Sequence, residues 1–359
     1  MSVIRSENIG LLSMDSNNNP VLLNPKKVSR QPIVDNRESN QYPINEPLYI
    51  DLYPSFICNQ NCVFCYNVFL KNNDKTVMTK EIADKVIDFC QRKGVFWINI
   101  VGGEPYHPKN VEITKYIVEK AFEKGIKSDI TTNLSFVNNE IVSFCKAHDV
   151  RFNVSLLAKD EEIGKKMAGA AKYDAISKID KHVNGKISFG ISTPILKINK
   201  KDIFNLCDYV SGLENCAWVL RYPTVPDEYG INLSIDEFYS ISKELIEKCN
   251  KKVYFDAPFC YKYMDSKLPQ NELDYLYGGC KAGLIKREIL PNGDVVSCIL
   301  LKEKVLGNIE KDNDFEAVSY RNPSCKNFSC QFNNFCTGCP GYLKLNNKKG
   351  DDRCAYYEA

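Results

Sequence analysis

Cysteine stands out in this sequence of 359 residues, because it occurs 16 times. Three of the cysteines lie close together, in Cys58-Asn-Gln-Asn-Cys62-Val-Phe-Cys65. Three thiolates at this spacing can hold three irons of a four-iron cluster and leave the fourth iron open to a substrate or cofactor. A structural zinc site or a ferredoxin-type cluster needs a fourth ligand, and no cysteine or histidine nearby supplies one. The spacing therefore predicts an iron–sulfur site with one open iron.

A second group of seven cysteines lies in the C-terminal part of the chain. Its members are Cys280, Cys298, Cys325, Cys330, Cys336, Cys339 and Cys354. The first residues, Met1 to Gly10, lack the apolar stretch of an export signal, so clustered thiols indicate metal binding in a reducing compartment rather than disulfides. Because apolar patterning is sparse after Tyr320, we expect a C-terminal region that is stabilised by metal.

The six remaining cysteines are spread singly. Five of them fall mostly on apolar faces and are expected in the core: Cys90, Cys145, Cys207, Cys216 and Cys249. Cys260 fits either a small buried hydrophobic residue or a further metal ligand.

Six short β-rich runs alternate with amphipathic helical stretches in the middle of the chain. The expected strands are 49–57, 96–101, 128–132, 152–157, 187–195 and 217–222. Strand–helix units in series predict an α/β fold, with a parallel sheet and helices outside it. Six units are too few for a closed eight-fold barrel, so we expect a partial (β/α)6 barrel. Its active site would lie at the C-terminal ends of the strands, where the first cysteine group follows the first strand.

The helices between these strands carry local start and stop signals. Thr79 can cap a helix that Gly94 ends, and Gly125 closes a second helix. Ser234 and Glu237 have the spacing of a capping box at the start of a helix over 235–250. Weaker helical stretches are expected at 141–147, 165–183 and 203–213.

The N-terminal 48 residues and the charge balance are less informative. Apolar runs on either side of residues 15–20 fit either a small hairpin or a disordered tail. The formal net charge of +2 gives no reason to expect nucleic acid or a membrane surface as a partner. No apolar run approaches the roughly 18 residues of a transmembrane helix, and a cytoplasmic location is expected.

The spacing of the first cysteine group, with aromatic Phe64 before Cys65, resembles the signature of the radical S-adenosylmethionine (SAM) superfamily. A second motif of that family resembles Gly102-Gly103-Glu104-Pro105, which follows the second strand. The resemblance implies that this motif binds the cofactor, with glycines that let the backbone approach its methionyl ammonium. It also implies contacts from Thr132, Asn133 and Ser155 to the cofactor, with 190–194 lining the adenine site.

This resemblance implies a mechanism. A reduced four-iron cluster passes one electron to the sulfonium of SAM, which yields methionine and a 5′-deoxyadenosyl radical. That radical removes hydrogen from an unactivated carbon of the substrate, while the protein supplies placement and excludes water. An electron donor such as flavodoxin or ferredoxin is the expected partner.

The C-terminal cysteines are similar in order to those of the SPASM domain, which binds two auxiliary clusters. All seven can be placed on that pattern, although two spacings in the compact four-cysteine run depart from it and the 280–298 interval is slightly long. The resemblance implies three [4Fe-4S] clusters in all. The inner auxiliary cluster would be held by Cys280, Cys298 and Cys339, with Cys260 or an open iron in fourth place. The outer cluster would be held by Cys325, Cys330, Cys336 and Cys354.

Together the two resemblances imply a partial barrel of the radical SAM type with a cysteine-rich auxiliary-cluster domain. The expected regions are an N-terminal extension over 1–48, the barrel over 49–225, a helical bridge over 226–277 and the auxiliary-cluster domain over 278–359. SPASM enzymes mostly modify ribosomally made peptides, so oxidative modification of a peptide is the leading hypothesis. The alternatives are sulfatase-type maturation, oxidation of a small alcohol or sugar, and an electron carrier without catalysis. Ile299 after Cys298 argues against the first, because the sulfatase-maturing proteins have Asp there.

Overall fold

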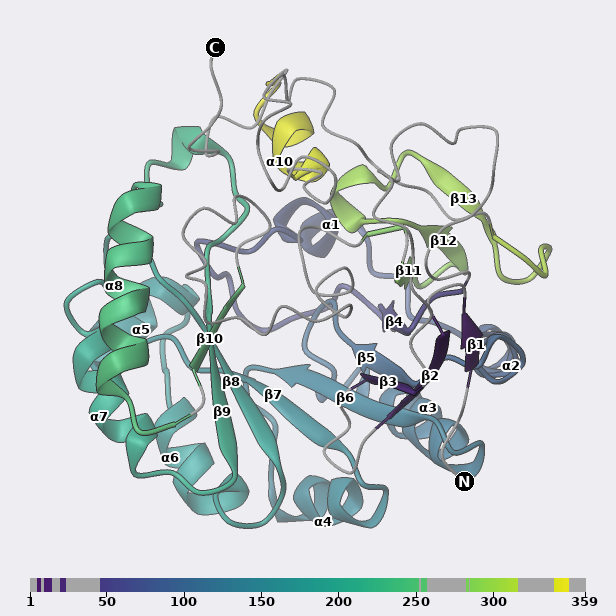
Figure 1. Cartoon of the computed structure of the whole chain (residues 1–359), viewed down its shortest axis with the longest axis horizontal. Coiled ribbons are helices and arrows are strands. Elements are labelled where there is room, and N and C mark those ends of the chain that lie inside the picture. The colour runs from purple at the N-terminus through teal and green to yellow at the C-terminus, as the bar shows by residue number, and fades with distance from the viewer. Residues whose placement is uncertain are drawn as a thin grey trace.

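Ten strands form one sheet in the computed structural model, in the order β10-β9-β8-β7-β6-β5-β4-β11-β12-β13. Six of them pair in parallel in chain order, and Figure 1 shows them fanned inside an arc of helices. These are β4 (Tyr49–Leu52), β5 (Trp97–Ile100), β6 (Lys127–Thr132), β7 (Arg151–Ser155), β8 (Phe189–Pro194) and β9 (Cys216–Arg221). The predicted partial (β/α)6 barrel is therefore confirmed. The structure describes residues 5–7, 10–14, 20–23, 46–251, 253–256, 282–283, 285–315 and 339–348.

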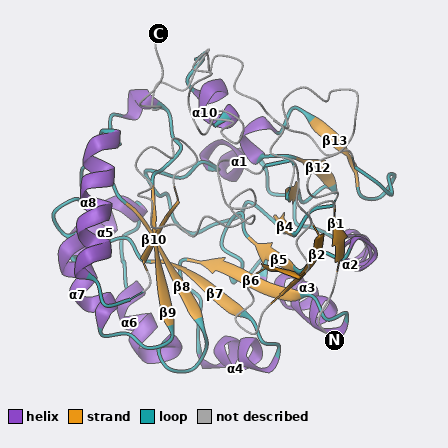
Figure 2. Cartoon of the chain, in the orientation of Figure 1, coloured by secondary structure: helices purple, strands orange, loops and turns teal. Residues whose placement is uncertain are grey.

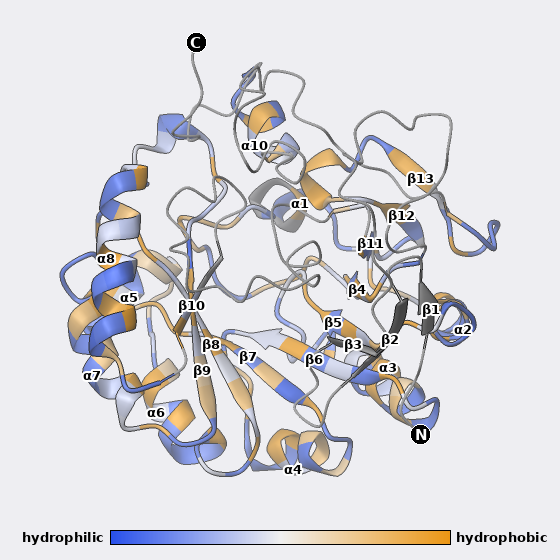
Figure 3. Cartoon of the chain, in the orientation of Figure 1, coloured by the Kyte–Doolittle hydropathy of each residue, from blue (hydrophilic) through white to orange (hydrophobic). Residues whose placement is uncertain are grey.

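The helices that connect these strands cover the outer face of the sheet (Figure 2). They are α2 (Lys80–Lys93), α3 (Val111–Glu123), α4 (Asn139–Ala147), α5 (Glu161–Ala168), α6 (Ala175–Lys178), a π-helical turn (Ile179–Val183), α7 (Ile203–Ser211) and α8 (Ile235–Lys248). Alternate strand residues such as Ile50, Ile98 and Phe152 are fully buried against them. Figure 3 shows the outer helices with hydrophobic and hydrophilic residues interspersed, as expected for helices with one face on a core and one in water.

The predicted helix signals are present in the structure. The Thr79 hydroxyl accepts a hydrogen bond from the Ile82 N–H at 3.3 Å, and Gly94 ends α2 with a φ of 63°. Ser234 and Glu237 form the expected capping box at the start of α8. These local hydrogen bonds explain why the sequence marks the ends of these helices clearly.

The expected helical stretch over 165–183 is wrong as one continuous element. The helix α5 ends at Gly169, whose φ is +57°, and helical structure resumes only with α6. A Cβ atom at Gly169 would lie 2.3 Å from the carbonyl oxygen of Asn61, in the first cysteine loop. The helix therefore stops where the chain packs closely against that loop.

The sheet extends beyond the six barrel strands at both edges. On one side β10 (Val253–Asp256) pairs in parallel with β9, and on the other β11 (Lys286–Ile289) pairs in parallel with β4. A turn at Gly293, with a φ of +83°, joins β11 to the antiparallel β12 (Asp294–Val296). This confirms the predicted strand–turn–strand unit, and β13 (Val305–Asn308) completes the sheet.

The remaining elements are short. They are α1 (Val68–Asn73), α10 (Pro340–Leu345) and the 3-10 turns Asp227–Tyr229 and Ile299–Leu301. At the N-terminus β1 (Arg5–Glu7), β2 (Gly10–Met14) and β3 (Pro20–Leu23) form a separate antiparallel sheet. The β2–β3 pair is the hairpin that the sequence suggested. Among the described helices none has the length and apolar character to cross a membrane.

Candidate functional site

The three cysteines of the first group lie in the loop that follows β4, at the C-terminal edge of the parallel strands. We call residues 58–65 the cysteine loop. All three cysteine side chains are partly exposed, and none forms a disulfide. The end of α5 holds the loop, because the carbonyls of Ala168 and Met167 accept the N–H groups of Asn61 and Val63 at 2.9 and 3.0 Å. The Asn61 and Val63 amides flank Cys62, so its position is fixed from both sides.

The Cys58 sulfur lies among hydrogen-bond donors. The Gln60 N–H lies 3.4 Å from it and the Asn133 side-chain amide 3.8 Å from it. Donors of this kind stabilise a thiolate and tune the potential of a cluster that it holds. The structure therefore brings Asn133, predicted to contact the cofactor, directly to a predicted cluster ligand.

We call Gly102-Gly103-Glu104-Pro105 the glycine motif. It packs against the backbone that leads into the cysteine loop. The N–H groups of Gly103 and Glu104 donate to the carbonyls of Ser55 and Ile57, each at 2.9 Å. A Cβ atom at Gly102, whose φ is +113°, would lie 2.6 Å from the Ser55 oxygen, and one at Gly103 would lie 2.0 Å from the Ile57 oxygen. From the sequence, these glycines are expected to let the backbone approach the cofactor. The structure adds a second reason, which is contact between the two motifs themselves.

Glu104 is fully buried and joins the glycine motif to the end of β6. Its carboxylate accepts hydrogen bonds from the Thr132 hydroxyl at 2.7 Å, the Asn133 N–H at 2.8 Å and the Tyr106 N–H at 3.2 Å. Burial raises the pKa of Glu104 to about 7, although the three hydrogen bonds act in the opposite direction. Three residues that are predicted to bind the cofactor therefore form one hydrogen-bonded unit, in which Glu104 accepts and Thr132 and Asn133 donate.

Two buried asparagines near the motifs were missed by the sequence analysis. The Asn110 amide donates to the carbonyls of Ile57 and Glu104 at 3.0 and 2.8 Å, and the Asn67 amide donates to the Gly102 carbonyl at 3.2 Å. Each stands at the start of a helix, so in sequence it has the signature of a cap, yet neither makes a capping bond. Within the described ranges the Asn67 side-chain oxygen is buried without a partner, so it could accept a hydrogen bond from a bound group.

Ser155 lies further along the sheet, at the end of β7 and level with Ser192 of β8. The Ser192 hydroxyl accepts a hydrogen bond from the Arg221 side chain at 2.6 Å. Thr193, within the predicted adenine segment, donates its hydroxyl hydrogen to the Leu156 carbonyl instead. Ser155 and residues 190–194 are predicted to contact the cofactor, and the support for this prediction is their position at the C-terminal ends of β7 and β8.

Two of the seven C-terminal cysteines lie in the described residues. Cys298 precedes the 3-10 turn at Ile299–Leu301, and Cys339 precedes α10. These elements pack together so closely that a Cβ atom at Gly341 would lie 2.8 Å from Leu300. Two members of the predicted inner set thus begin neighbouring elements. The other predicted ligands lie outside the described residues: Cys260, Cys280, Cys325, Cys330, Cys336 and Cys354.

The expected core cysteines are in the core, with one partial exception. Cys90, Cys145, Cys207 and Cys249 are buried, and Cys216 at the start of β9 is partly exposed. Within the described part of the chain, no three His, Cys, Asp or Glu side chains converge on a single metal ion. A four-iron cluster places several irons and sulfides between its thiolates, so its ligands stand further apart than those of one ion. The donor set of the cysteine loop fits such a cluster.

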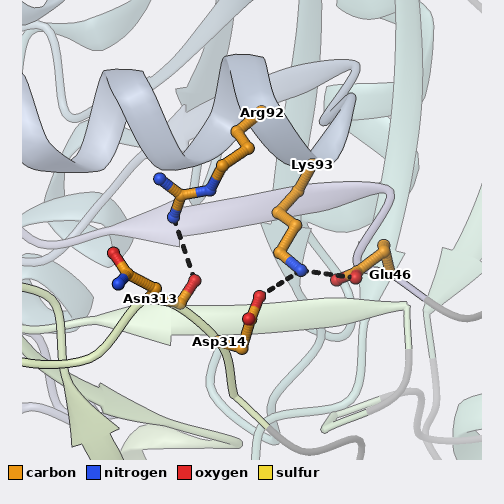
Figure 4. Close-up of a pocket in the computed structure, with 5 residues that line it drawn as sticks. All are labelled: Glu46, Arg92, Lys93, Asn313 and Asp314. Atoms are coloured by element: carbon orange, nitrogen blue, oxygen red, sulfur yellow. Dashed lines mark hydrogen bonds and ion pairs between the residues drawn. The ribbon is translucent and has the colours of Figure 1, made fainter.

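A surface pocket lies at the opposite end of the strands (Figure 4). Lys93, at the end of α2, pairs there with Glu46 at 2.7 Å and with Asp314, while Arg92 donates to the Asn313 carbonyl at 2.9 Å. The end of α2 leads into β5, so this pocket is at the N-terminal edge of the sheet. Its residues come from the segment before β4, the end of α2 and the segment after β13, and none of them belongs to the cysteine loop.

Comparison with known proteins agrees with this geometry. The model of the Radical SAM superfamily matches residues 52–210. The mycofactocin maturase MftC of Mycobacterium tuberculosis is 23% identical over 288 residues, which cover 77% of this chain and 71% of that protein. A probable GTP 3′,8-cyclase of Methanocaldococcus jannaschii is 25% identical over 206 residues, covering 55% and 65% of the two chains.

Solved structures show the same fold. Streptococcus suis SuiB bound to its precursor peptide SuiA is similar with a TM-score of 0.77 at 19% identity, covering 100% of this chain and 98% of that one. Native anSMEcpe with bound AdoMet is similar with a TM-score of 0.64 at 15% identity, covering 86% and 94%. The cysteine loop and the glycine motif both lie within residues 52–210, and this segment is a Radical SAM domain, of the kind that uses a four-iron cluster and SAM.

Proposed function

We propose that this chain is a radical SAM enzyme that oxidatively modifies a peptide. The observation that carries this proposal is the likeness to SuiB bound to its precursor peptide, which extends over nearly all of both chains. The similarity to a protein named as a maturase over 77% of this chain supports it independently. Because SPASM-type enzymes mostly act on ribosomal peptides, both likenesses favour the same substrate class.

The bound cluster and SAM would supply a 5′-deoxyadenosyl radical that takes hydrogen from the peptide. In this proposal Cys58, Cys62 and Cys65 hold the cluster, and the backbone of the glycine motif faces the methionyl end of SAM. The Asn133 amide stabilises the Cys58 sulfur, and Glu104 holds Asn133 in place. The role of these side chains is to fix the cofactor site before substrate arrives.

We further propose two auxiliary clusters on the seven C-terminal cysteines, which makes three [4Fe-4S] clusters in all. The packing of the Cys298 and Cys339 elements supports a shared inner cluster. A peptide radical that forms a new bond must lose one electron and one proton, and a nearby cluster is a suitable electron acceptor. A flavodoxin or ferredoxin would supply the electron that starts each turnover. The domain limits at 48, 225 and 277 are part of the same proposal.

The test is anaerobic turnover with SAM, a reductant and candidate short peptides, beginning with any that are encoded beside this gene. We expect 5′-deoxyadenosine together with a peptide that is lighter by two hydrogens. No 5′-deoxyadenosine would contradict radical chemistry and favour an electron carrier. Cleavage without any peptide change would contradict the substrate class, and an epimerised peptide of unchanged mass would contradict the oxidation.

A second candidate, sulfatase-type maturation, is favoured by the similarity to anSMEcpe, which has also been solved with a Cp18Cys peptide. Ile299 argues against it, because a carboxylate is expected at that position. Incubation with a sulfatase-derived peptide that contains the target Cys or Ser separates the two candidates, and we expect no aldehyde product.

A further inference from the structure

Strand β11 places two charged side chains on the face of the sheet that is turned away from the helices. In β4, Ile50 and Leu52 are buried toward the helices, so Asp51 between them points to the other face. The Lys286 ammonium lies 3.0 Å from the Asp51 carboxylate and 2.5 Å from the Glu288 carboxylate. Glu288 is only 2% exposed. A buried charged group persists when its hydrogen bonds are satisfied, so the partners of Glu288 indicate its role.

Glu288 accepts hydrogen bonds from three different parts of the chain. One oxygen accepts from Lys286 of its own strand. The other accepts from the Tyr53 hydroxyl at 3.0 Å and from the Ile299 N–H at 2.7 Å. Tyr53 directly follows β4, and Ile299 directly follows Cys298. One carboxylate therefore ties the barrel to the segment that carries a predicted auxiliary-cluster ligand.

Tyr53, which donates to Glu288, also contacts the glycine motif and lies close in sequence to the cysteine loop. A Cβ atom at Gly102 would lie 3.0 Å from the Tyr53 ring, so the ring packs directly on the glycine motif. Tyr53 is also five residues before Cys58, the first residue of the cysteine loop. The path from Cys298 to the glycine motif thus consists of one backbone amide, one carboxylate and one tyrosine. Each of these groups is buried or held by a hydrogen bond at 3.0 Å or less.

We propose that Glu288 is a positioning residue that fixes Cys298, and the auxiliary cluster it would hold, relative to the cysteine loop. This inference rests on the proposed function, because it requires that Cys298 is a cluster ligand. A negatively charged carboxylate suits this position, because the Lys286 ammonium, the Tyr53 hydroxyl and the Ile299 N–H all donate hydrogen bonds to it. Alanine removes all three contacts. Glutamine keeps an acceptor for one side of the site but places its NH2 group toward donors on the other side.

The test compares Glu288→Ala and Glu288→Gln with the unchanged protein, each reconstituted anaerobically. For Glu288→Ala, we expect the ratio of peptide product to 5′-deoxyadenosine to fall about tenfold or more, since a misplacement of ~1 Å can cost about 100-fold in rate. Iron content should stay near that of the unchanged protein. The electron paramagnetic resonance spectrum or the reduction potential of the auxiliary cluster should shift. Glu288→Gln should restore part of the product ratio and part of the spectrum.

Asp129→Asn is the matched control. Asp129 is a buried carboxylate paired with Arg151, with a 3.1 Å contact, and among the described residues no hydrogen bond or ion pair joins either of them to a cysteine segment. It should leave both the product ratio and the cluster spectrum unchanged. If Glu288→Ala fails to fold, the comparison of Glu288→Gln with Asp129→Asn still decides. A folded Glu288 variant with an unchanged ratio and spectrum overturns the positioning role.

Cys298→Ala separates this inference from the proposed function. We expect that variant to lose the inner-cluster signal and to form no product. If it loses the signal while the Glu288 variants behave like the unchanged protein, only the positioning role fails. If it keeps full iron and full product, Cys298 is not a ligand, and the inference falls together with the auxiliary-cluster proposal.

Discussion

Replacement of Glu104 by glutamine removes the buried carboxylate that joins the glycine motif to β6. Glutamine has nearly the same shape, so the loop can keep its path. One side of its amide can still accept from two of the three donors, but the NH2 group would then face the third donor. At low pH we therefore expect Glu104→Gln to be less stable than the unchanged protein, by about 1–3 kcal/mol for the unsatisfied buried donor.

The pH dependence gives the sharper expectation. The pKa of Glu104 is about 7 in the folded chain, compared with an ordinary value of 4.5. The folded state therefore binds a proton more tightly than the unfolded state. The resulting stability is fully present below about pH 4.5 and is lost as the pH rises through about 7. A shift of this size corresponds to about 3 kcal/mol, at 1.36 kcal/mol per pKa unit, and most of it is lost between about pH 5 and pH 8.

Glutamine has no ionisable group, so the variant does not lose this part of its stability as the pH rises. The stability of Glu104→Gln should approach or exceed that of the unchanged protein as the pH rises. The assay is urea unfolding of both proteins without iron, at about pH 5 and about pH 8, with Glu140→Gln as the control. Glu140 is exposed and pairs with Lys115 on the surface, so its variant should follow the unchanged protein at both pH values. A stability difference between Glu104→Gln and the unchanged protein that stays constant within about 1 kcal/mol over this range would refute the argument.

Three further predictions follow from the same geometry. Gly103→Ala should lower the free energy of unfolding in urea by about 3 kcal/mol, because its Cβ would meet the Ile57 backbone. Gly125→Ala should lower it by only about 1 kcal/mol, because no atom lies within 4 Å of the added Cβ and only the φ of +72° opposes the change. Replacement of all three cysteines of the cysteine loop by alanine should abolish 5′-deoxyadenosine formation while the auxiliary iron stays bound; continued cleavage would disprove their role. Reconstituted protein should hold about twelve irons per chain, and saturation near four, or stoichiometric zinc, would contradict the auxiliary clusters.

Much of the barrel could be predicted because its signals are local. Alternating apolar residues mark the strands, and the caps at Thr79 and Ser234 are short hydrogen-bonded units that the sequence contains complete. The cysteine loop and the glycine motif are also short, and each follows a strand. Since the ends of parallel strands meet at one edge of a sheet, the sequence alone placed the two motifs together.

The interactions that hold the site together could not be predicted in the same way. Asn110 and Asn67 stand where a helix cap would stand, and only the folded chain shows their amides bonded to the cofactor motifs instead. Gly169 ends α5 because it meets Asn61, more than a hundred residues earlier in the sequence. Contacts between residues so far apart in the sequence produce no periodic pattern, so they cannot be predicted from the sequence alone.

The place of β11 has the largest consequence for function. In sequence, β11 has three charged residues in a row, Lys286, Arg287 and Glu288, just before the Pro291-to-Gly293 turn, and such a run would ordinarily indicate a solvated edge. In the structure β11 pairs with β4, the strand that leads to the cysteine loop, and its charges are buried in hydrogen bonds to that strand. The strands that lead to Cys298 therefore continue the barrel sheet. Cys298 follows β12 and the cysteine loop follows β4. Strand β11 lies between these two strands in one sheet, and its Glu288 bonds to Tyr53 after β4 and to Ile299 after Cys298. Electron transfer between the two proposed clusters would depend steeply on their distance, and these hydrogen bonds would help to fix that distance before substrate binds.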